Sequence, residues 1–250
     1  MKKLLLGSLV LLAFSSAAMA DEVRVAVAAN FTAPMQELAP LFEKATGDKL
    51  VVSYGATGAF FAQIKNGAPF DAFLAADSKT PTKAVNEGYA VKGTQFPYAM
   101  GKLILWSPEE GLIKDAKSLD SEKIVKLAVA DPKLAPYGEA AFQTMKALGV
   151  LAKLEPKFVM GNNIGKTFQF VNTKNAQAGF VALSQVFKDG KLKSGSGWEV
   201  PTDLYQPIRQ DAVLLNPGKD NAGAKRFLEF LKTSPEAARI RAAYGYGTPQ

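Results

Sequence analysis

The chain of 250 residues contains no cysteine and no histidine. Without cysteine it can form no disulfide bond and no zinc–thiolate site, and it has no thiolate nucleophile. Without histidine it lacks the commonest general base and metal ligand, so Ser-His-Asp and Cys-His catalysis are excluded. These absences argue against an enzyme and favour a protein that binds a ligand without reacting with it.

Long apolar runs are also scarce, and the first of them covers residues 4–14. It follows Lys2-Lys3, precedes Ala18-Met19-Ala20, and is shorter than the ~20 residues that a membrane-spanning helix needs. A basic start, a short apolar stretch and a small-residue box are typical of a signal peptide. We therefore predict that residues 1–20 are removed after Ala20 and that the mature protein is exported to the periplasm.

Dense runs of one charge are missing as well. The chain carries 30 Lys and Arg against 23 Asp and Glu, a formal net charge of +7, and its lysines are scattered. Nucleic acid is not an expected partner, because proteins that bind it usually gather their basic residues on one face. The mild positive balance instead favours the attraction of a small anion.

Strand-like and helix-like segments alternate along the chain, which predicts an α/β fold with mixed, mainly parallel sheets. The expected strands lie near residues 23–28, 50–54, 72–77, 102–106, 127–130, 158–160, 179–183 and 209–215. Expected helices lie near residues 35–46, 59–65, 79–88, 135–148, after 165 and 221–231.

The two strand–turn–helix series are of similar size, so we predict two lobes. Lobe one comprises residues 21–99 and 208–250, and lobe two comprises residues 100–207. The lobes are joined by a two-segment hinge, for which Gln95-Phe96-Pro97-Tyr98 and Tyr205-Gln206-Pro207 are the best candidates, because a residue before proline favours extended backbone. In such folds the carboxyl ends of the strands of both lobes face one cleft.

The first two strands run into turns that each open a helix. These turns are Ala29-Asn30-Phe31-Thr32 and Gly55-Ala56-Thr57-Gly58. The first N–H groups of a helix have no partner within the helix, and they bind anions. Two such turns that converge would form an anion pocket without a formal charge.

At this point the residues resemble a known family. The segments that carry the resemblance are Ala28-Ala29-Asn30-Phe31-Thr32, Gly55-Ala56-Thr57-Gly58, Asn66-Gly67-Ala68-Pro69-Phe70-Asp71, Phe73-Leu74-Ala75-Ala76-Asp77, Asp131-Pro132, Ala135-Pro136-Tyr137-Gly138 and Gly179-Phe180-Val181-Ala182. Each segment alone is weak, but together and in this order they are specific. The chain resembles the periplasmic molybdate-binding proteins of ABC importers over nearly all of its length after residue 20.

The resemblance implies a type II periplasmic-binding-protein fold and a role in transport. The expected ligand is molybdate, and tungstate is expected to bind as well. Capture in the periplasm is expected to be followed by delivery to an inner-membrane ABC permease. Molybdenum would be held as its oxyanion, with no direct protein ligand to the metal and no cofactor, and the protein is expected to be a monomer.

The resemblance also implies which residues hold the oxyanion. By position, Asn30 offers a side chain and an N–H, Thr57 stands where many relatives have serine, and Tyr137 and Ile164 contribute backbone N–H groups. Ala29 is an additional candidate. Ala182 stands where many relatives place a tyrosine that contacts the anion, and it has no side-chain donor, so Asn30 is a candidate for supplying the missing contact.

Other interpretations stay open from the residues alone. Asn30 and Thr57 also suit ordinary helix caps, and the ligand could be sulfate, phosphate or chromate. An exported hydrolase would need paired carboxylates, but Asp71, Asp77 and Asp131 are interpreted as structural, since Asp131 precedes proline and Asp77 begins a turn and helix cap. A sensor that docks to a receptor is a further alternative. Ser194-Gly195-Ser196-Gly197 is interpreted as a flexible loop, because no Gly-Lys-Ser/Thr follows it.

Overall fold

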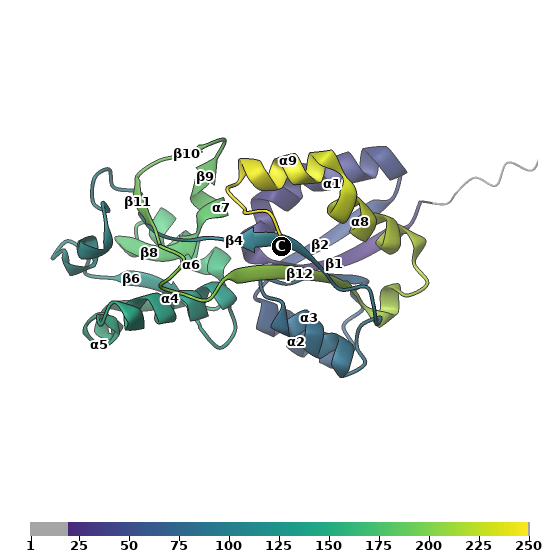
Figure 1. Ribbon diagram of the computed structural model, residues 1–250, viewed down its shortest axis with the longest axis horizontal. Coiled ribbons are helices and arrows are strands. Elements are labelled where there is room, and N and C mark those ends of the chain that lie inside the picture. The colour runs from purple at the N-terminus through teal and green to yellow at the C-terminus, as the bar shows by residue number, and fades with distance from the viewer. Residues whose placement is uncertain (1–19, 250) are drawn as a thin grey trace, which may run out of the picture.

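The computed structural model describes residues 20–249, which form two α/β units side by side (Figure 1). Each unit is built around a five-stranded sheet. The predicted signal peptide lies outside the described residues apart from Ala20, so cleavage after Ala20 stays a prediction. Within residues 20–249, no helix combines the length and the apolar character that crossing a membrane requires.

The first sheet has the strand order β2-β1-β3-β12-β4. Its strands are β1 (Glu22–Ala28), β2 (Lys49–Gly55), β3 (Ala72–Leu74), β4 (Phe96–Gly101) and β12 (Ile208–Leu214). Successive side chains of a strand point to opposite faces of its sheet. In β1 the side chains on both faces are buried from Val25 onward. Val23, Val25 and Val27 enter one buried cluster and Ala26 enters another.

Helices cover both faces of the first sheet (Figure 1). One face carries α1 (Thr32–Thr46), which follows the short 3₁₀ turn η1 (Ala29–Phe31), together with α8 (Ala222–Thr233) and α9 (Pro235–Ala243). The other face carries α2 (Thr57–Lys65) and α3 (Lys79–Asn86). Phe42 and Phe227 pack edge to face at 5.4 Å between centroids on the first face, and Phe60 packs near Phe73 on the second.

The second sheet has the strand order β11-β5-β8-β6-β7. Its strands are β5 (Leu103–Ser107), β6 (Leu127–Ala130), β7 (Phe158–Gly161), β8 (Ala178–Ala182) and β11 (Ser196–Glu199). Helices α4 (Pro136–Ala147) and α5 (Leu151–Leu154) pack on one face. Helix α6 (Ile164–Asn172) and the short α7 (Leu183–Val186) pack on the other, and a small hairpin of β9 (Phe187–Lys188) and β10 (Lys191–Leu192) follows α7.

The mixed α/β fold predicted from the sequence is confirmed, but parallel pairs do not dominate. Strand β1 runs parallel to β2 and β3, and β6 runs parallel to β7 and β8. The remaining pairs, β12 with β3 and β4 and β5 with β8 and β11, are antiparallel. The antiparallel pairs arise where the chain passes between the two sheets, since β4, β5, β11 and β12 flank the passages.

The chain passes between the sheets twice. Strand β4 ends at Gly101 and β5 begins at Leu103, so Lys102 alone separates a strand of the first sheet from one of the second. The return passage lies between β11 and β12, at residues 200–207. We use "lobe one" and "lobe two" for the predicted division at residues 99/100 and 207/208, which stays a prediction.

Two segments differ from expectation. Ser196 and Gly197 belong to β11 and pair with Ser107 and Trp106, so the flexible-loop interpretation of residues 194–197 is wrong at its second half. Gly197 packs tightly there, because a Cβ at this position would lie 2.7 Å from the Ile104 Cδ1 atom. Helix α9 was not anticipated.

Candidate functional site

A small space, here called the central cavity, lies between the two lobes. Its lining residues come from the ends of β1, β2 and β3 and from the starts of α2, α4 and α6: Ala28, Ala29, Asn30, Gly55, Ala56, Thr57, Ala76, Ala135, Pro136, Tyr137 and Ile164. The space open to the centre of a water-sized sphere is ≈ 10 Å³, about that of one water molecule. None of the lining residues carries a formal charge.

Helix starts from both lobes converge on the central cavity. Turn η1 begins at Ala29, α2 at Thr57, α4 at Pro136 and α6 at Ile164. Proline has no N–H, so Tyr137 carries the first free backbone donor of α4. Helix N-termini combine unpaired N–H groups with the positive end of the helix dipole. The cavity is therefore electropositive without a charged side chain.

The residues expected from the sequence to contact the oxyanion lie together in the lining of the central cavity: Asn30, Thr57, Tyr137, Ile164 and Ala29. Ala182 is not among the lining residues, and its N–H already donates to the Gln185 Oε1 atom at 2.9 Å. Contact of these residues with a ligand stays a prediction.

Thr57 is buried and is the first residue of α2, whose N-cap position is occupied by Ala56. It is therefore not the helix cap that one interpretation of the sequence allowed. Its Oγ1 atom accepts a hydrogen bond from the Ala76 N–H at 2.9 Å. This contact occupies an acceptor position of the hydroxyl and leaves its hydrogen for donation, because a hydroxyl both accepts and donates.

Asn30 is 1% exposed, and its side-chain amide faces other protein groups. Its Nδ2 atom donates to the Gln210 Oε1 atom at 2.9 Å and to the Tyr246 Oη atom at 2.8 Å. Both amide hydrogens therefore have protein acceptors in this arrangement. Within residues 20–249, the Asn30 Oδ1 atom is the buried side-chain polar atom that lacks a hydrogen-bond partner.

The Tyr137 side chain points toward β4 and β12, and only its backbone opens the helix at the cavity. Its hydroxyl accepts a hydrogen bond from the Gln210 Nε2 atom at 3.0 Å. A Cβ on Gly101 would lie 2.2 Å from this hydroxyl, so the close approach requires glycine in β4. Burial raises the pKa of the Tyr137 hydroxyl well above its ordinary value of 10, which keeps it protonated at neutral pH.

Ile164 opens α6 directly after Asn163, whose side chain caps the helix. The Asn163 Oδ1 atom accepts from the Lys166 N–H at 2.8 Å. The Ile164 side chain is apolar, so only its backbone N–H could meet an anion.

Contacts between the lobes enclose the cavity. The Gly58 N–H donates to the Leu134 carbonyl oxygen at 3.0 Å, and the Ser184 Oγ atom donates to the Asn30 carbonyl oxygen at 2.9 Å. A surface ion pair joins Lys188 and Glu37. The two lobes are therefore in direct contact on more than one side of the cavity.

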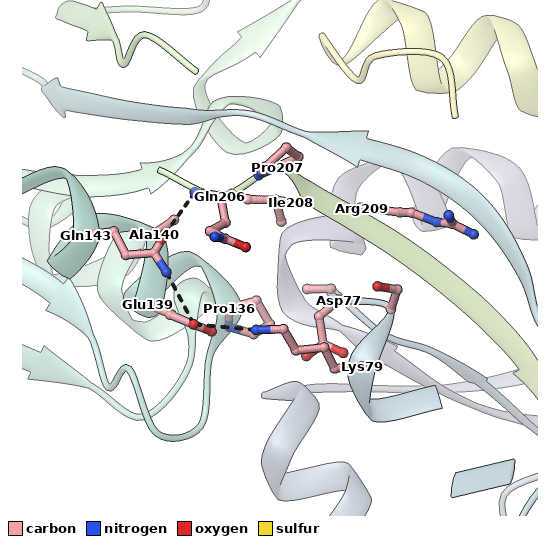
Figure 2. Close-up of a pocket in the computed structure, with 12 residues that line it drawn as sticks. Asp77, Lys79, Pro136, Glu139, Ala140, Gln143, Gln206, Pro207, Ile208 and Arg209 are labelled. Carbon is pink, nitrogen blue, oxygen red and sulfur yellow. Dashed lines mark hydrogen bonds and ion pairs between the residues drawn. The ribbon is translucent and has the colours of Figure 1, made fainter. Parts of the chain in front are cut away.

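Charged side chains lie in an adjoining groove of ≈ 60 Å³ (Figure 2), which shares Ala76 and Pro136 with the central cavity. Lys79 of lobe one reaches Glu139 of lobe two at 3.7 Å, and Gln143 lies between Glu139 and Gln206 (Figure 2). Both members of the ion pair are at least half exposed, so the pair contributes little to stability.

The carboxylates considered for catalysis bind backbone N–H groups instead of lining the central cavity. Asp71 accepts from the Arg24 N–H, Asp77 from the Thr80 N–H, and Asp131 from the Lys133 N–H, at 2.7, 2.7 and 2.9 Å. Desolvation raises the pKa of Asp77, and the hydrogen bonds from Thr80 oppose this rise. Asp77 and Asp131 therefore bind N–H groups of their own turns, whereas Asp71 joins the segment before β3 to β1.

A larger groove of ≈ 760 Å³ opens beside the central cavity and shares Ala29 and Asn30 with it. Lobe one contributes Tyr54 to its wall, and lobe two contributes Asn162 and Gln169. Lys166 and Lys193 are the charged residues among the described residues that line it. An anion would meet positive charge at this mouth before it reached the neutral cavity.

The fold and the cavity together define a two-lobed protein that encloses a small solute between its lobes. The family model for bacterial extracellular solute-binding proteins matches residues 23–247, and the chain belongs to this family.

Individual relatives narrow the comparison. The chain is 54% identical over 232 residues to the molybdate-binding protein ModA of Azotobacter vinelandii, covering 92% of each chain. It is 51% identical over 231 residues to the molybdate-binding protein ModA of Rhodobacter capsulatus, covering 92% of this chain and 90% of the relative. The solved structure of an Azotobacter vinelandii periplasmic molybdate-binding protein superposes with a TM-score of 0.87 at 39% identity, covering 91% of this chain and 100% of that one.

Proposed function

We propose that this protein captures molybdate in the periplasm and delivers it to an inner-membrane ABC permease. The observation that carries the proposal is the convergence of helix N-termini from both lobes on a cavity whose lining residues are all uncharged. The similarity to proteins named for molybdate binding supports the choice of ligand.

The chemistry of the cavity fits a fully deprotonated oxyanion. The backbone N–H groups of Asn30, Thr57, Tyr137 and Ile164 and the Thr57 hydroxyl are the proposed donors. Ala29 is an additional candidate, and Ala182 is no longer favoured because its N–H is bonded to Gln185. Hydrogen bonds from neutral donors to a charged acceptor are about twice as strong as neutral ones.

The proposed ligand is the cargo and not a cofactor, and no cofactor is required for capture and release. Molybdenum stays inside its oxygen shell, so the residues contact oxygen atoms. Tungstate has the same charge and shape and is proposed as a second ligand. Sulfate, phosphate and chromate are the alternative occupants, and cavity size is the property that would separate sulfate from molybdate.

The proposed cycle is binding, closure, docking and release by a monomer. Hinge closure around a ligand is a common motion of two-lobed binding proteins. No turnover of the ligand is proposed, so the protein is a transport component and not an enzyme. A chain that docks to a sensor receptor is the alternative for the partner.

Calorimetry with molybdate, tungstate, sulfate and phosphate tests the proposal. We expect molybdate to bind with one ion per chain and sulfate to bind far more weakly. Thr57→Ala should weaken molybdate binding, whereas Asp131→Asn, outside the cavity, should leave it unchanged. Saturable binding of sulfate without binding of molybdate would overturn the proposed ligand and keep the proposed class.

A further inference from the structure

A buried cluster of polar side chains joins the central cavity to β4 and β12, the strands of the first sheet that flank the two passages between the sheets. This hinge cluster consists of Asn30, Tyr98, Tyr137, Ser184, Gln210 and Tyr246. Gln210 is 0% exposed and lies at its centre. It sits in β12 at a register shift between β12 and β4, and such irregularities re-aim side chains next to functional sites.

Gln210 touches both the cavity residue Asn30 and the lobe-two residue Tyr137. Its Oε1 atom accepts from the Asn30 Nδ2 atom at 2.9 Å and from the Tyr98 hydroxyl at 3.1 Å. Its Nε2 atom donates to the Tyr137 hydroxyl at 3.0 Å. One amide therefore connects the cavity, the hinge and the first helix of lobe two that lines the cavity.

This arrangement leaves two mismatches within the described residues. The Asn30 Oδ1 atom is buried without a donor. The Tyr137 hydroxyl accepts from Gln210, and its own hydrogen has no acceptor among residues 20–249. Buried polar groups are nearly always paired, so two mismatches at opposite ends of one hydrogen-bonded chain call for a physical explanation.

Rotating the side-chain amides of Asn30 and Gln210 by half a turn gives the Tyr137 hydroxyl hydrogen an acceptor. It also replaces the unpaired Asn30 oxygen with an unpaired Asn30 nitrogen. Amide nitrogen and oxygen have nearly the same shape, so the contact distances stay the same. Tyr137 then donates to the Gln210 oxygen, and the Gln210 nitrogen donates to the Asn30 oxygen and to the Tyr98 oxygen. Tyr98 keeps an acceptor of its own, because its hydroxyl also lies 3.1 Å from the Ala75 carbonyl oxygen.

After the rotation, the Asn30 amide nitrogen occupies the place of the unpaired oxygen. It then needs an acceptor, and an oxyanion in the cavity that Asn30 lines would supply one. Without an anion neither polarity pairs every group. With an anion in the cavity, only the rotated polarity gives every polar group a hydrogen-bond partner.

We propose that Gln210 is a positioning residue that turns the Asn30 amide so that its nitrogen faces the bound oxyanion. This inference rests on the proposed function, since it takes an oxyanion as the ligand. Tyr137 anchors the chain of hydrogen bonds from lobe two by donating to Gln210. The donor that Asn30 presents therefore depends on the position of lobe two, which couples binding to closure.

A double-mutant cycle tests whether Gln210 acts through Asn30. The variants are Gln210→Met, which keeps the length of the side chain without its amide, Asn30→Ala, and the pair. Gln143→Met is the matched control, since Gln143 also hydrogen-bonds near the hinge, to Glu139 and Gln206, but lies outside the hinge cluster. Molybdate affinity is measured by calorimetry on the full mature chain.

We expect Gln210→Met to weaken molybdate binding about tenfold, and to have almost no further effect once Asn30 is alanine. Gln143→Met should bind as the unchanged protein does. Independent, multiplying losses from Gln210→Met and Asn30→Ala would overturn the inference, as would full affinity in Gln210→Met. Failure of the unchanged protein to bind molybdate would instead overturn the proposed function.

A measurement on the unchanged chain covers the case in which Gln210→Met does not fold. In the molybdate-saturated, ¹⁵N-labelled protein, nuclear Overhauser contacts locate the Gln210 side-chain NH₂ group. The rotated polarity places this group beside the Tyr98 hydroxyl, and the polarity of the described structure places it beside the Tyr137 hydroxyl. Strongest contacts to Tyr98 would support the inference, and strongest contacts to Tyr137 would overturn it.

Discussion

The two lobes approach the central cavity with different chemical groups. Lobe one brings the Thr57 hydroxyl and, in the rotated polarity inferred above, the Asn30 amide nitrogen, as well as the N–H groups of its helix starts. Lobe two brings helix starts at which Tyr137 turns its hydroxyl toward Gln210 and Ile164 has no polar side chain. Residue identity should therefore matter for binding in lobe one, whereas lobe two should tolerate substitutions that keep the backbone in place.

The largest effect is expected from lobe one. Thr57→Ala removes the hydroxyl donor to a charged ligand and also leaves the Ala76 N–H without its acceptor. Losing a hydrogen bond to a charged group costs about 1.5–3 kcal/mol, so affinity should fall roughly ten- to a hundredfold. Calorimetry with molybdate measures the loss, and Thr57→Ser, which keeps the hydroxyl, is the control. Equal affinities for Thr57→Ala and Thr57→Ser would remove the hydroxyl from the site.

A smaller effect is expected where the lobes touch. Gly58→Ala would place a Cβ 3.2 Å from the Leu134 carbonyl oxygen, which is backbone and cannot swing away. Overpacking costs about 1–3 kcal/mol, and the lobes can relieve it by parting slightly. We therefore expect affinity to fall at least about fivefold, near the lower end of that range. Small-angle scattering should show a larger radius of gyration for the molybdate-bound variant than for the unchanged protein.

Lobe two should respond much less. Ile164→Val keeps the backbone N–H at the start of α6 and removes one buried methylene, whose contribution is about 1 kcal/mol of unfolding free energy. Molybdate affinity should stay within about twofold, which is the expected outcome when only the backbone binds. Calorimetry and thermal unfolding of the same sample separate the two quantities. A tenfold loss of affinity without loss of stability would show that the side chain itself shapes the site.

The smallest effect is expected from pH. Burial raises the pKa values of Tyr98 and Tyr137 well above 10, and that of Tyr246 is raised as well, so these hydroxyls stay neutral. The residues that line the central cavity include no carboxylate, lysine or histidine. Molybdate affinity should therefore be flat from about pH 6 to 9. A steep dependence measured by calorimetry would place a titrating group such as Asp77 at the ligand.

Local signals in the sequence predicted much of the fold and of the cavity. In β1 every second residue from Val23 to Val27 is a buried valine, which is a signal of a strand. Thr57 follows the end of a strand and opens a helix, so its place could also be inferred from neighbouring residues. Helix α9 carried a readable signal that was missed: Ser234 precedes Pro235, and its Oγ atom accepts from the Ala237 N–H at 2.9 Å. Strand β11 is short and contains glycine, and it forms because β5 offers an edge.

The hinge cluster could not be predicted from local patterns. Gln210 lies 180 residues from Asn30 in sequence, and Tyr246 lies 216 residues from it. Nothing in the residues around Gln210 distinguishes a buried amide at a hinge from an ordinary polar residue in a strand. The role of the Tyr137 hydroxyl was open for the same reason, because its partner Gln210 lies in β12, 73 residues away in sequence.

Anomalous X-ray diffraction from crystals grown with molybdate is the most direct test of where the ligand binds. Molybdenum scatters anomalously, so its position is found without assumptions about the surrounding residues. We predict a single molybdenum site per chain inside the central cavity, with oxygen atoms within hydrogen-bonding distance of the N–H groups of Thr57 and Tyr137. A molybdenum site in the charged groove beside Lys79 and Arg209, or beside Lys166 at the mouth, with the central cavity free of molybdenum, would contradict the account.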